Sequence, residues 1–215
     1  MEVTNLKDFD THAVMGGSDI VSFGISNSAE FITVLSKTLY SDEMLAVVRE
    51  TICNAWDAHI VTNRQDIPVE VTISKEHILI RDFGPGITHN MIQQVYCVYG
   101  ASTKTRDGNQ TGGFGLGCKA PFAYSDHFTV TSMHNGVKTV YAASRGSSET
   151  QGLPDMRIMA QMPTEETGLE VCNPIQNERD TPIFRDKAYK VIVEGGINAK
   201  LNGGIISTLN IDTSE

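Results

Sequence analysis

The chain has 215 residues, of which 40% are hydrophobic and 20% are charged, a composition typical of a globular domain that buries a core. With 17 basic and 26 acidic residues the formal net charge is -9, which argues against a nucleic-acid-binding module held by phosphate contacts. The longest apolar runs fall far short of the roughly 20 residues that span a bilayer, and the N-terminus lacks a signal-peptide pattern, so we expect a cytoplasmic protein without a transmembrane segment.

The cysteines indicate a reduced compartment. They form no C-x-x-C pair and have no histidine at metal-ligand spacing; they are Cys53, Cys97, Cys118 and Cys172. Because disulfide frameworks belong to small secreted chains, we expect each cysteine to be a small buried apolar group.

In chain order, residues 1–27 are mixed and contain glycine, and they predict an irregular N-terminal arm. Apolar residues at helical spacing predict a helix over 29–40. Ser41 or Asp42 can cap a second, longer helix that runs to about Thr62. The expected buried stripe of this helix is Leu45, Val48, Ile52, Ala55 and Trp56.

The middle of the chain carries strand and loop signals. Residues 69–74 and 77–82 alternate apolar and polar side chains and predict an antiparallel hairpin that turns at Lys75-Glu76. A short helix is expected over 90–98. The polar, glycine-rich stretch 100–117 is too long for a simple turn, and such stretches are lids, binding loops or disordered segments.

Four more strands are expected in the second half of the chain, over 127–133, 137–143, 157–162 and 168–174. Asn135-Gly136 is a strong hairpin signal between the first two. Asp180-Thr181-Pro182 opens a final helix that reaches about Val193, and the tail after Gly195 is weakly patterned. The sum is an α+β domain, with a mostly antiparallel sheet and helices packed on one face.

Three groups of residues have the chemistry of a functional site. In the first, Glu50, Asn54 and Asp57 fall within an arc of about 60° on one face of the long predicted helix. A solvated stripe is the ordinary interpretation, but such a stripe usually contains Lys, and this helix is apolar around most of its remaining circumference. Two carboxylates with an amide between them suit a general base and a hydrated Mg²⁺.

The second group, Arg81-Asp82-Phe83-Gly84-Pro85-Gly86-Ile87, places a carboxylate at the end of a predicted strand, before a sharp turn. In a plain turn, Asp82 would accept hydrogen bonds from nearby backbone N–H groups. In a binding site, it would point into a pocket whose glycine walls admit a flat ring. The residues alone leave both interpretations open.

The third group has four glycines in six positions, Gly112, Gly113, Gly115 and Gly117, before an apparent helix start at 119–122. Glycines let successive backbone N–H groups converge on an anion, so this segment suits a phosphate cradle. The spacing is not that of the G-x-x-x-x-G-K-[ST] loop, and no clear strand precedes it as in a dinucleotide-binding fold.

Together, the motifs Glu50-x-x-x-Asn54-x-x-Asp57, Asp82-x-Gly84-x-Gly86 and Gly113-x-Gly115-x-Gly117 resemble those of the Bergerat-fold (GHKL) ATPases. This superfamily includes gyrase, Hsp90, histidine kinases and the mismatch-repair protein MutL. Thr167-Gly168, which enters a predicted strand, resembles its last motif. The resemblance covers about residues 28–175, and the segments 48–50, 81–86 and 112–122 look closest to phage rIIA-type rapid-lysis proteins.

The resemblance implies a Bergerat α/β sandwich that binds ATP and Mg²⁺. Glu50 would be the catalytic base that orients water, Asn54 the Mg²⁺ ligand, and Asp82, supported by Thr167, the acceptor for the adenine amino group. Residues 112–117 would form part of a mobile lid, and Lys104 or Lys119 would offset phosphate charge. The implied nucleotide-binding residues are Asn54, Asp57, Asp82, Gly84, Gly86, Ile87, Lys104, Gly112, Gly113, Phe114, Gly115, Leu116, Gly117, Lys119 and Thr167.

The resemblance also has departures. ATP-hydrolysing relatives usually carry a second domain that supplies a lysine to the terminal phosphate, and no recognisable version of that motif follows Thr167-Gly168. Either this sequence is a piece of a longer protein, or hydrolysis is slow or absent. The main alternative to a slow ATPase is a nucleotide-gated module that binds ATP to engage a partner. No histidine lies in a helical pair typical of a kinase phosphoacceptor, and the intact Glu50, Asn54 and Asp82 argue against a scaffold that has lost nucleotide.

The expected organisation is an N-terminal arm (1–27), an ATP-binding domain (28–178), and a C-terminal helix and tail (179–215). By resemblance, the partners are adenine nucleotide, an unidentified protein and a second copy in an ATP-dependent homodimer. An rIIA-like protein would act in the cytoplasm of an infected bacterium, with peripheral association at the inner membrane.

Overall fold

The structure is a computed structural model, and it describes residues 41–96, 117–145 and 154–206. The predicted arm, the helix over 29–40 and most of the glycine-rich stretch therefore lie outside the described residues.

Four α-helices and eight strands make up the described part of the chain. The helices are α2 (Glu43–Val61), α3 (His89–Tyr96), α4 (Pro121–Tyr124) and α5 (Thr181–Glu194). The strands are β1 (Val69–Ile73), β2 (His77–Arg81), β3 (His127–His134), β4 (Val137–Ser144), β5 (Asp155–Pro163), β6 (Gly168–Pro174), β7 (Ala199–Leu201) and β8 (Gly204–Ile206). Each strand and helix expected in the described ranges is present, with ends shifted by a few residues at most.

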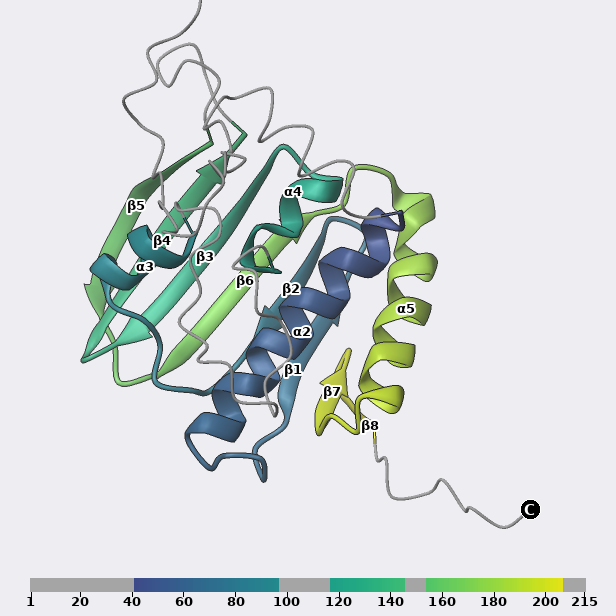
Figure 1. The fold of residues 1–215 in the computed structure, drawn as a ribbon, viewed down its shortest axis with the longest axis horizontal. Helices are drawn as coiled ribbons and strands as arrows, with labels where there is room; N and C mark the ends of the chain where they lie inside the picture. The colour runs from purple at the N-terminus through teal and green to yellow at the C-terminus, as the bar shows by residue number, and fades with distance from the viewer. Residues whose placement is uncertain (1–40, 97–116, 146–153, 207–215) are drawn as a thin grey trace, which may run out of the picture.

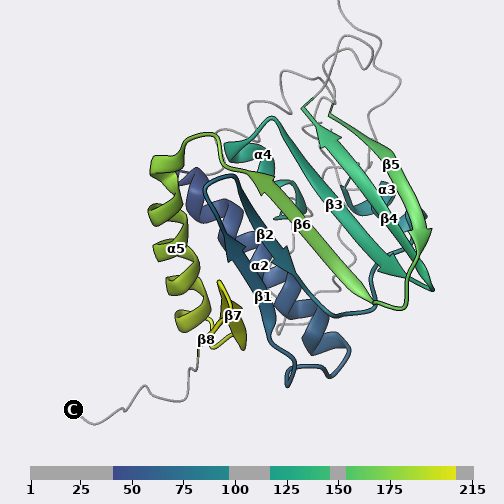
Figure 2. The same cartoon turned by 180° about the vertical axis from the view of Figure 1, so that it is seen from behind.

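The strands form one sheet in the order β5-β4-β3-β6-β2-β1-β7-β8. All neighbouring pairs are antiparallel except β1 and β7, which are parallel. In Figure 1, α2, α3 and α4 lie in front of the sheet and α5 lies beside α2. The view from behind shows the strands in front of these helices (Figure 2). The predicted α+β class, with a mostly antiparallel sheet and helices on one face, is confirmed.

The hydrophobic core is divided into two clusters, which correspond to two groups of elements on the same face of the sheet. The first joins α2 and α5 to β1 and β2 and includes Val48, Ile52, Val71, Ile80 and Phe184. The second joins α3 and α4 to β3, β4 and β6 and includes Ile92, Phe122, Phe128, Val130 and Tyr141. The strand β2 ends beside β6, where the two groups of elements meet.

The long helix α2 follows its predicted pattern with one correction. Val48, Ile52 and Ala55 are buried as expected, whereas Leu45 and Trp56 are only partly buried and pack against the first cluster. Leu45 lies in the first turn of the helix, near its end, and a ring as large as that of Trp56 is rarely enclosed completely.

The tail after Gly195 corrects the sequence analysis, because it contains β7 and β8. Strands of three residues are too short for alternation to reveal. Their position depends on tertiary contacts: the Asn202 side chain accepts a hydrogen bond from the Ile73 N–H at 2.7 Å and donates one to the Ile73 carbonyl at 3.1 Å. The helix expected from 119 is also short, since a 3-10 turn at Gly117–Lys119 leads into the four-residue α4.

The cap of α2 provides a test of this architecture. The Asp42 carboxylate accepts from the Leu45 N–H at 2.9 Å and forms an ion pair with Lys187 of α5. Because it satisfies a helix N-terminal donor, we expect Asp42→Ala to lower the free energy of unfolding by about 1 kcal/mol at pH 7, measured by urea denaturation. Ser41→Ala, at the exposed neighbouring position, is the control and should change little.

The same variant has a predicted pH dependence. The hydrogen bonds from Lys187 and Leu45 lower the pKa of Asp42. Its stabilising contribution is therefore present above the unfolded carboxyl pKa of about 3.9 and is lost as the pH falls through the lowered folded value. An equal loss of stability in Asp42→Ala at pH 7 and at pH 2 would contradict a role for the charged cap.

Candidate nucleotide-binding site

The polar face of α2 is not a solvated stripe. Asp57 is buried, and Glu50 and Asn54 are half-buried. Arg49 donates to Glu50 Oε1 at 3.0 Å across the exposed edge of this group. The helical spacing that aligns these residues thus places a carboxylate and an amide where they are only partly open to water.

The described end of the glycine-rich segment lies against this polar face. A Cβ atom added at Gly117 would lie 2.6 Å from Glu50 Oε2 and 3.6 Å from Asn54 Nδ2. The first distance is shorter than real Cβ contacts, so a side chain at this position would displace the flexible end of Glu50. The structure therefore brings together two predicted groups that are far apart in sequence. The other predicted residues of the segment, Lys104, Gly112, Gly113, Phe114, Gly115 and Leu116, lie outside the described residues.

Asp82 follows β2 directly, and its side chain is buried, with 4% of the residue exposed. Oδ1 accepts from the Gly84 N–H at 2.8 Å and from the Leu169 N–H at 3.1 Å. No hydrogen bond from a described residue reaches Oδ2. Burial raises the pKa of Asp82 to about 6, against the opposing effect of the two N–H donors and of Arg81.

The turn after Asp82 passes close to its neighbours. A Cβ atom at Gly84 would lie 2.9 Å from the Ala58 Cβ of α2. Gly86 has a φ of +67°, and a Cβ there would lie 2.4 Å from the Met133 carbonyl oxygen. The Ser132 hydroxyl accepts from the Ile87 N–H at 2.9 Å and donates to the Ile87 carbonyl at 2.7 Å. The turn is thus wedged between α2 and β3.

Three side chains to which the sequence analysis assigned no role hold this turn. His59 is fully buried; its Nε2 accepts from the Phe83 N–H at 2.8 Å, so Nδ1 carries the hydrogen that is donated to the Ile67 carbonyl at 3.0 Å. The ring is therefore neutral, in agreement with a pKa that burial lowers. No spacing or motif in the sequence marks His59 for this contact.

The other two side chains are arginines that join the turn to the residue before β6. Arg81 donates to the Asp82 carbonyl and, at 2.9 Å, to the Thr167 carbonyl. Arg64 donates to the Phe83 carbonyl and, at 3.2 Å, to the Thr167 hydroxyl. Thr167 is thereby connected to the Asp82 turn from two sides, although no direct bond joins its side chain to the Asp82 carboxylate.

Lys119 is buried, and its ammonium donates to the Val95 carbonyl near the C-terminal end of α3 at 2.7 Å. The ammonium of this predicted phosphate contact is thus bonded to α3 in the structure.

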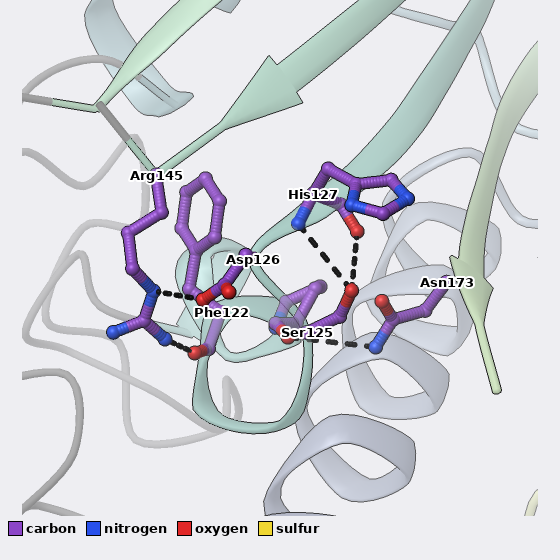
Figure 3. A network of polar contacts seen from close by, with 7 residues as sticks. Phe122, Ser125, Asp126, His127, Arg145 and Asn173 are labelled. Atoms are coloured by element: carbon purple, nitrogen blue, oxygen red, sulfur yellow. Dashed lines mark hydrogen bonds and ion pairs between the residues drawn. The ribbon is translucent and has the colours of Figure 1, made fainter. Parts of the chain in front are cut away.

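The elements after Lys119 are anchored by the network in Figure 3. Arg145, at the end of β4, donates to the Phe122 carbonyl of α4 and lies 3.0 Å from Asp126. On the other side, Asn173 of β6 donates to the Pro121 carbonyl at 3.5 Å. These contacts fix α4, and with it the 3-10 turn that contacts Glu50.

The donor set is compatible with Mg²⁺ and a triphosphate. Glu50 and Asn54 offer oxygen ligands, which Mg²⁺ prefers, and this ion usually takes only one or two protein ligands and completes its shell with phosphates and water. Within the described ranges no cluster of three or more His, Cys, Asp or Glu side chains forms a metal site. Side chains of the described residues alone therefore do not complete a metal site, and phosphate and water would supply the remaining ligands.

The comparison with protein families decides the class of the domain. A family described as histidine kinase-, DNA gyrase B- and HSP90-like ATPase matches residues 41–178, more than half of the chain. The chain belongs to this ATPase family. The ATPase domain binds adenine nucleotide, in agreement with the resemblance of its motifs to the Bergerat-fold superfamily. A search among curated proteins found no match, so the relation to rIIA-type proteins stays a prediction.

None of the helices in the described ranges combines the length and the apolar character that a membrane span requires.

The buried Asp82 predicts a conflict between stability and binding in this ATPase domain. Ionising a carboxyl whose pKa is raised from 3.8 to about 6 costs about 3 kcal/mol of stability above pH 6, and this cost disappears below about pH 4. In Asp82→Asn the amide oxygen can still accept from Gly84 and Leu169, while the charge is gone. We expect this variant to be more stable than wild type at pH 8, by up to about 3 kcal/mol, in urea denaturation.

The difference should shrink as the pH falls toward 4, because the wild-type carboxyl then becomes neutral. Glu165→Gln, which removes an exposed carboxylate in the loop between β5 and β6, is the control and should show no such trend. An Asp82→Asn variant that is less stable than wild type at pH 8 would contradict the cost assigned to the buried charge.

Proposed function

We propose that this ATPase domain recognises adenine through Asp82, binds Mg²⁺ through Asn54 and uses Glu50 as the general base that orients the attacking water. The observation that carries the proposal is the state of the buried Asp82 carboxylate. Its Oδ1 is occupied by two backbone N–H groups, and Oδ2 receives no hydrogen bond from a described residue. Such an oxygen has the capacity to accept from an external amino group.

The phosphate end is proposed at Glu50, Asn54 and the glycine segment 112–117. Gly117 lies against both α2 side chains, so a phosphate chain held by backbone N–H groups of this segment would lie beside the base. Bound Mg²⁺ would reduce the negative charge of the phosphates, which a chain of net charge -9 otherwise repels. In this proposal Glu50 would hold a water molecule and accept its proton, which is positioning and electrostatic chemistry.

A second candidate function is a nucleotide-gated interaction module with little turnover. The position of Lys119 favours this alternative. The ammonium of this predicted phosphate contact is bonded to the Val95 carbonyl of α3. In this alternative, bound nucleotide changes the shape of the protein and a partner recognises that shape, so that hydrolysis is incidental.

We also propose a relation to phage rIIA-type proteins, which rests on the segments 48–50, 81–86 and 112–122. Such a protein would act in the cytoplasm of an infected bacterium, at the periphery of the inner membrane, with a protein partner still to be identified. We propose the arm 1–27 as the contact of an ATP-dependent homodimer, 28–178 as the ATP-binding domain, and 179–215 as its C-terminal helix and tail.

The proposal is tested by calorimetric titration with a non-hydrolysable ATP analogue and its GTP counterpart, with and without Mg²⁺. Guanine presents a carbonyl oxygen where adenine presents an amino group, so two acceptors would face each other at Asp82. We expect adenine to be favoured by at least about 100-fold. Asn54→Ala should remove most of the Mg²⁺ dependence while preserving this preference.

Two results would overturn the assignments separately. Equal affinity for the two nucleotides would exclude the adenine role of Asp82. An Asn54→Ala variant that responds to Mg²⁺ like wild type would exclude the metal role of Asn54.

The role of Glu50 is tested by Glu50→Gln. A base acts on water and not on the ligand, so the variant should bind ATP within a few-fold of wild type and lose any hydrolysis, measured by phosphate release. Glu43→Gln, which removes an exposed carboxylate in the first turn of the same helix, serves as the control and should retain turnover. Loss of ATP binding in a folded Glu50→Gln variant would contradict the assignment, and a wild type without turnover would favour the nucleotide-gated module.

A further inference from the structure

The Thr167 hydroxyl contacts Arg64, a side chain that donates hydrogen bonds and cannot accept them. Its Oγ1 lies 3.2 Å from Arg64 Nη1, and the same nitrogen also donates to the Phe83 carbonyl. A guanidinium has five N–H donors and no acceptor, whereas a hydroxyl has one hydrogen and two lone pairs. The Thr167 oxygen must therefore be the acceptor toward Arg64, and its own hydrogen points elsewhere.

This arrangement gives the base end of the site a defined donor as well as a defined acceptor. Asp82 Oδ2 is the acceptor, and the Thr167 hydroxyl, whose lone pair is engaged by Arg64, is the donor. Adenine presents an amino donor beside a ring-nitrogen acceptor on the corresponding edge. Guanine presents a carbonyl acceptor beside a ring N–H donor, so its carbonyl would face the Asp82 acceptor, and its N–H would have to use the one lone pair of the Thr167 hydroxyl that Arg64 leaves open.

Contacts of the backbone also keep Thr167, which carries the donor, close to Asp82, which carries the acceptor. Arg81 donates to the carbonyls of both Asp82 and Thr167. Gly168 has a φ of +119°, and a Cβ atom there would lie only 2.1 Å from the Asp82 carbonyl oxygen. The backbone beside Thr167 is therefore pressed against that of Asp82, which keeps the two residues close together.

We propose that Arg64 is a specificity-determining positioning residue: by engaging the Thr167 hydroxyl and the Phe83 carbonyl, it orients a hydrogen-bond donor beside Asp82 and so sets the preference for adenine over guanine. The inference rests on the proposed adenine role of Asp82. Arg64 itself touches no reacting group, and it acts through Thr167. Arg64 lies in the segment between α2 and β1, which contains none of the sequence motifs.

The experiment compares ATP-analogue and GTP-analogue affinities, by calorimetry with Mg²⁺, in wild type, Arg64→Ala, Arg64→Lys, Thr167→Val and Thr167→Ser. One hydrogen bond is at stake, so Arg64→Ala and Thr167→Val should each narrow the ATP/GTP affinity ratio by about tenfold. Lys can donate to both acceptors and Ser keeps the hydroxyl, so these two variants should retain most of the ratio. Arg185→Ala, on the exposed surface of α5, is the matched control.

The double variant Arg64→Ala/Thr167→Val adds a decisive measurement. If Arg64 acts through the Thr167 hydroxyl, the double variant should lose no more selectivity than either single variant. Independent, additive losses would overturn the mechanism.

The remaining outcomes are also informative. A folded Arg64→Ala protein with the wild-type ratio, even at lower affinity for both nucleotides, would show a merely structural role and overturn the inference. If Arg64→Ala fails to fold, the Thr167→Val variant provides the test, since Thr167 is exposed. A wild-type ATP/GTP affinity ratio in that variant would overturn the inference. A wild type that does not distinguish the nucleotides would instead overturn the proposed adenine role of Asp82, so the two failures can be told apart.

Discussion

The buried carboxylate of Asp82 is the constraint on which the rest of the site depends. An ionised carboxylate in the interior is costly unless hydrogen-bond donors offset its burial, and here one of its two oxygens, Oδ1, accepts backbone N–H bonds from Gly84 and Leu169. These donors belong to different parts of the chain, so the end of β2 and the start of β6 must meet. Glycine at 168 makes this close contact of the two backbone segments possible, because a side chain at this position would clash with the Asp82 carbonyl.

The division of the core explains why polar side chains can gather at that meeting point. One apolar cluster lies under α2 and α5, and the other lies under α3 and α4. Each cluster stabilises its own part of the helical layer, so the polar face of α2 need not be filled with apolar side chains. The 3-10 turn at Gly117 reaches this face from the second group of elements. The two apolar clusters therefore stabilise the fold on both sides of the region where the charged and polar side chains gather.

Much of this could be predicted from the sequence because it depends on local chemistry. The cap at Asp42, the Asn135-Gly136 turn with positive φ at both residues, and the alternation in β1 and β2 each reflect the conformational preferences of a few neighbouring residues. Helical periodicity similarly predicted that Glu50, Asn54 and Asp57 share one face of α2. The motif spacings were sufficient to indicate the ATPase family that the comparison then established.

The sequence by itself therefore determined the elements, the fold class and the nucleotide-binding family, since periodicity, capping and glycine spacing act over a few residues. Only the tertiary structure decided which side chains hold the motifs together. His59, Arg64 and Arg81 reach backbone groups of Phe83, Asp82 and Thr167 across separations of up to 86 residues, and β7 pairs with β1 through strands too short to show a period. Such contacts form when hydrophobic burial brings distant segments together and their buried polar groups must find partners, and no local pattern records which partner each will find.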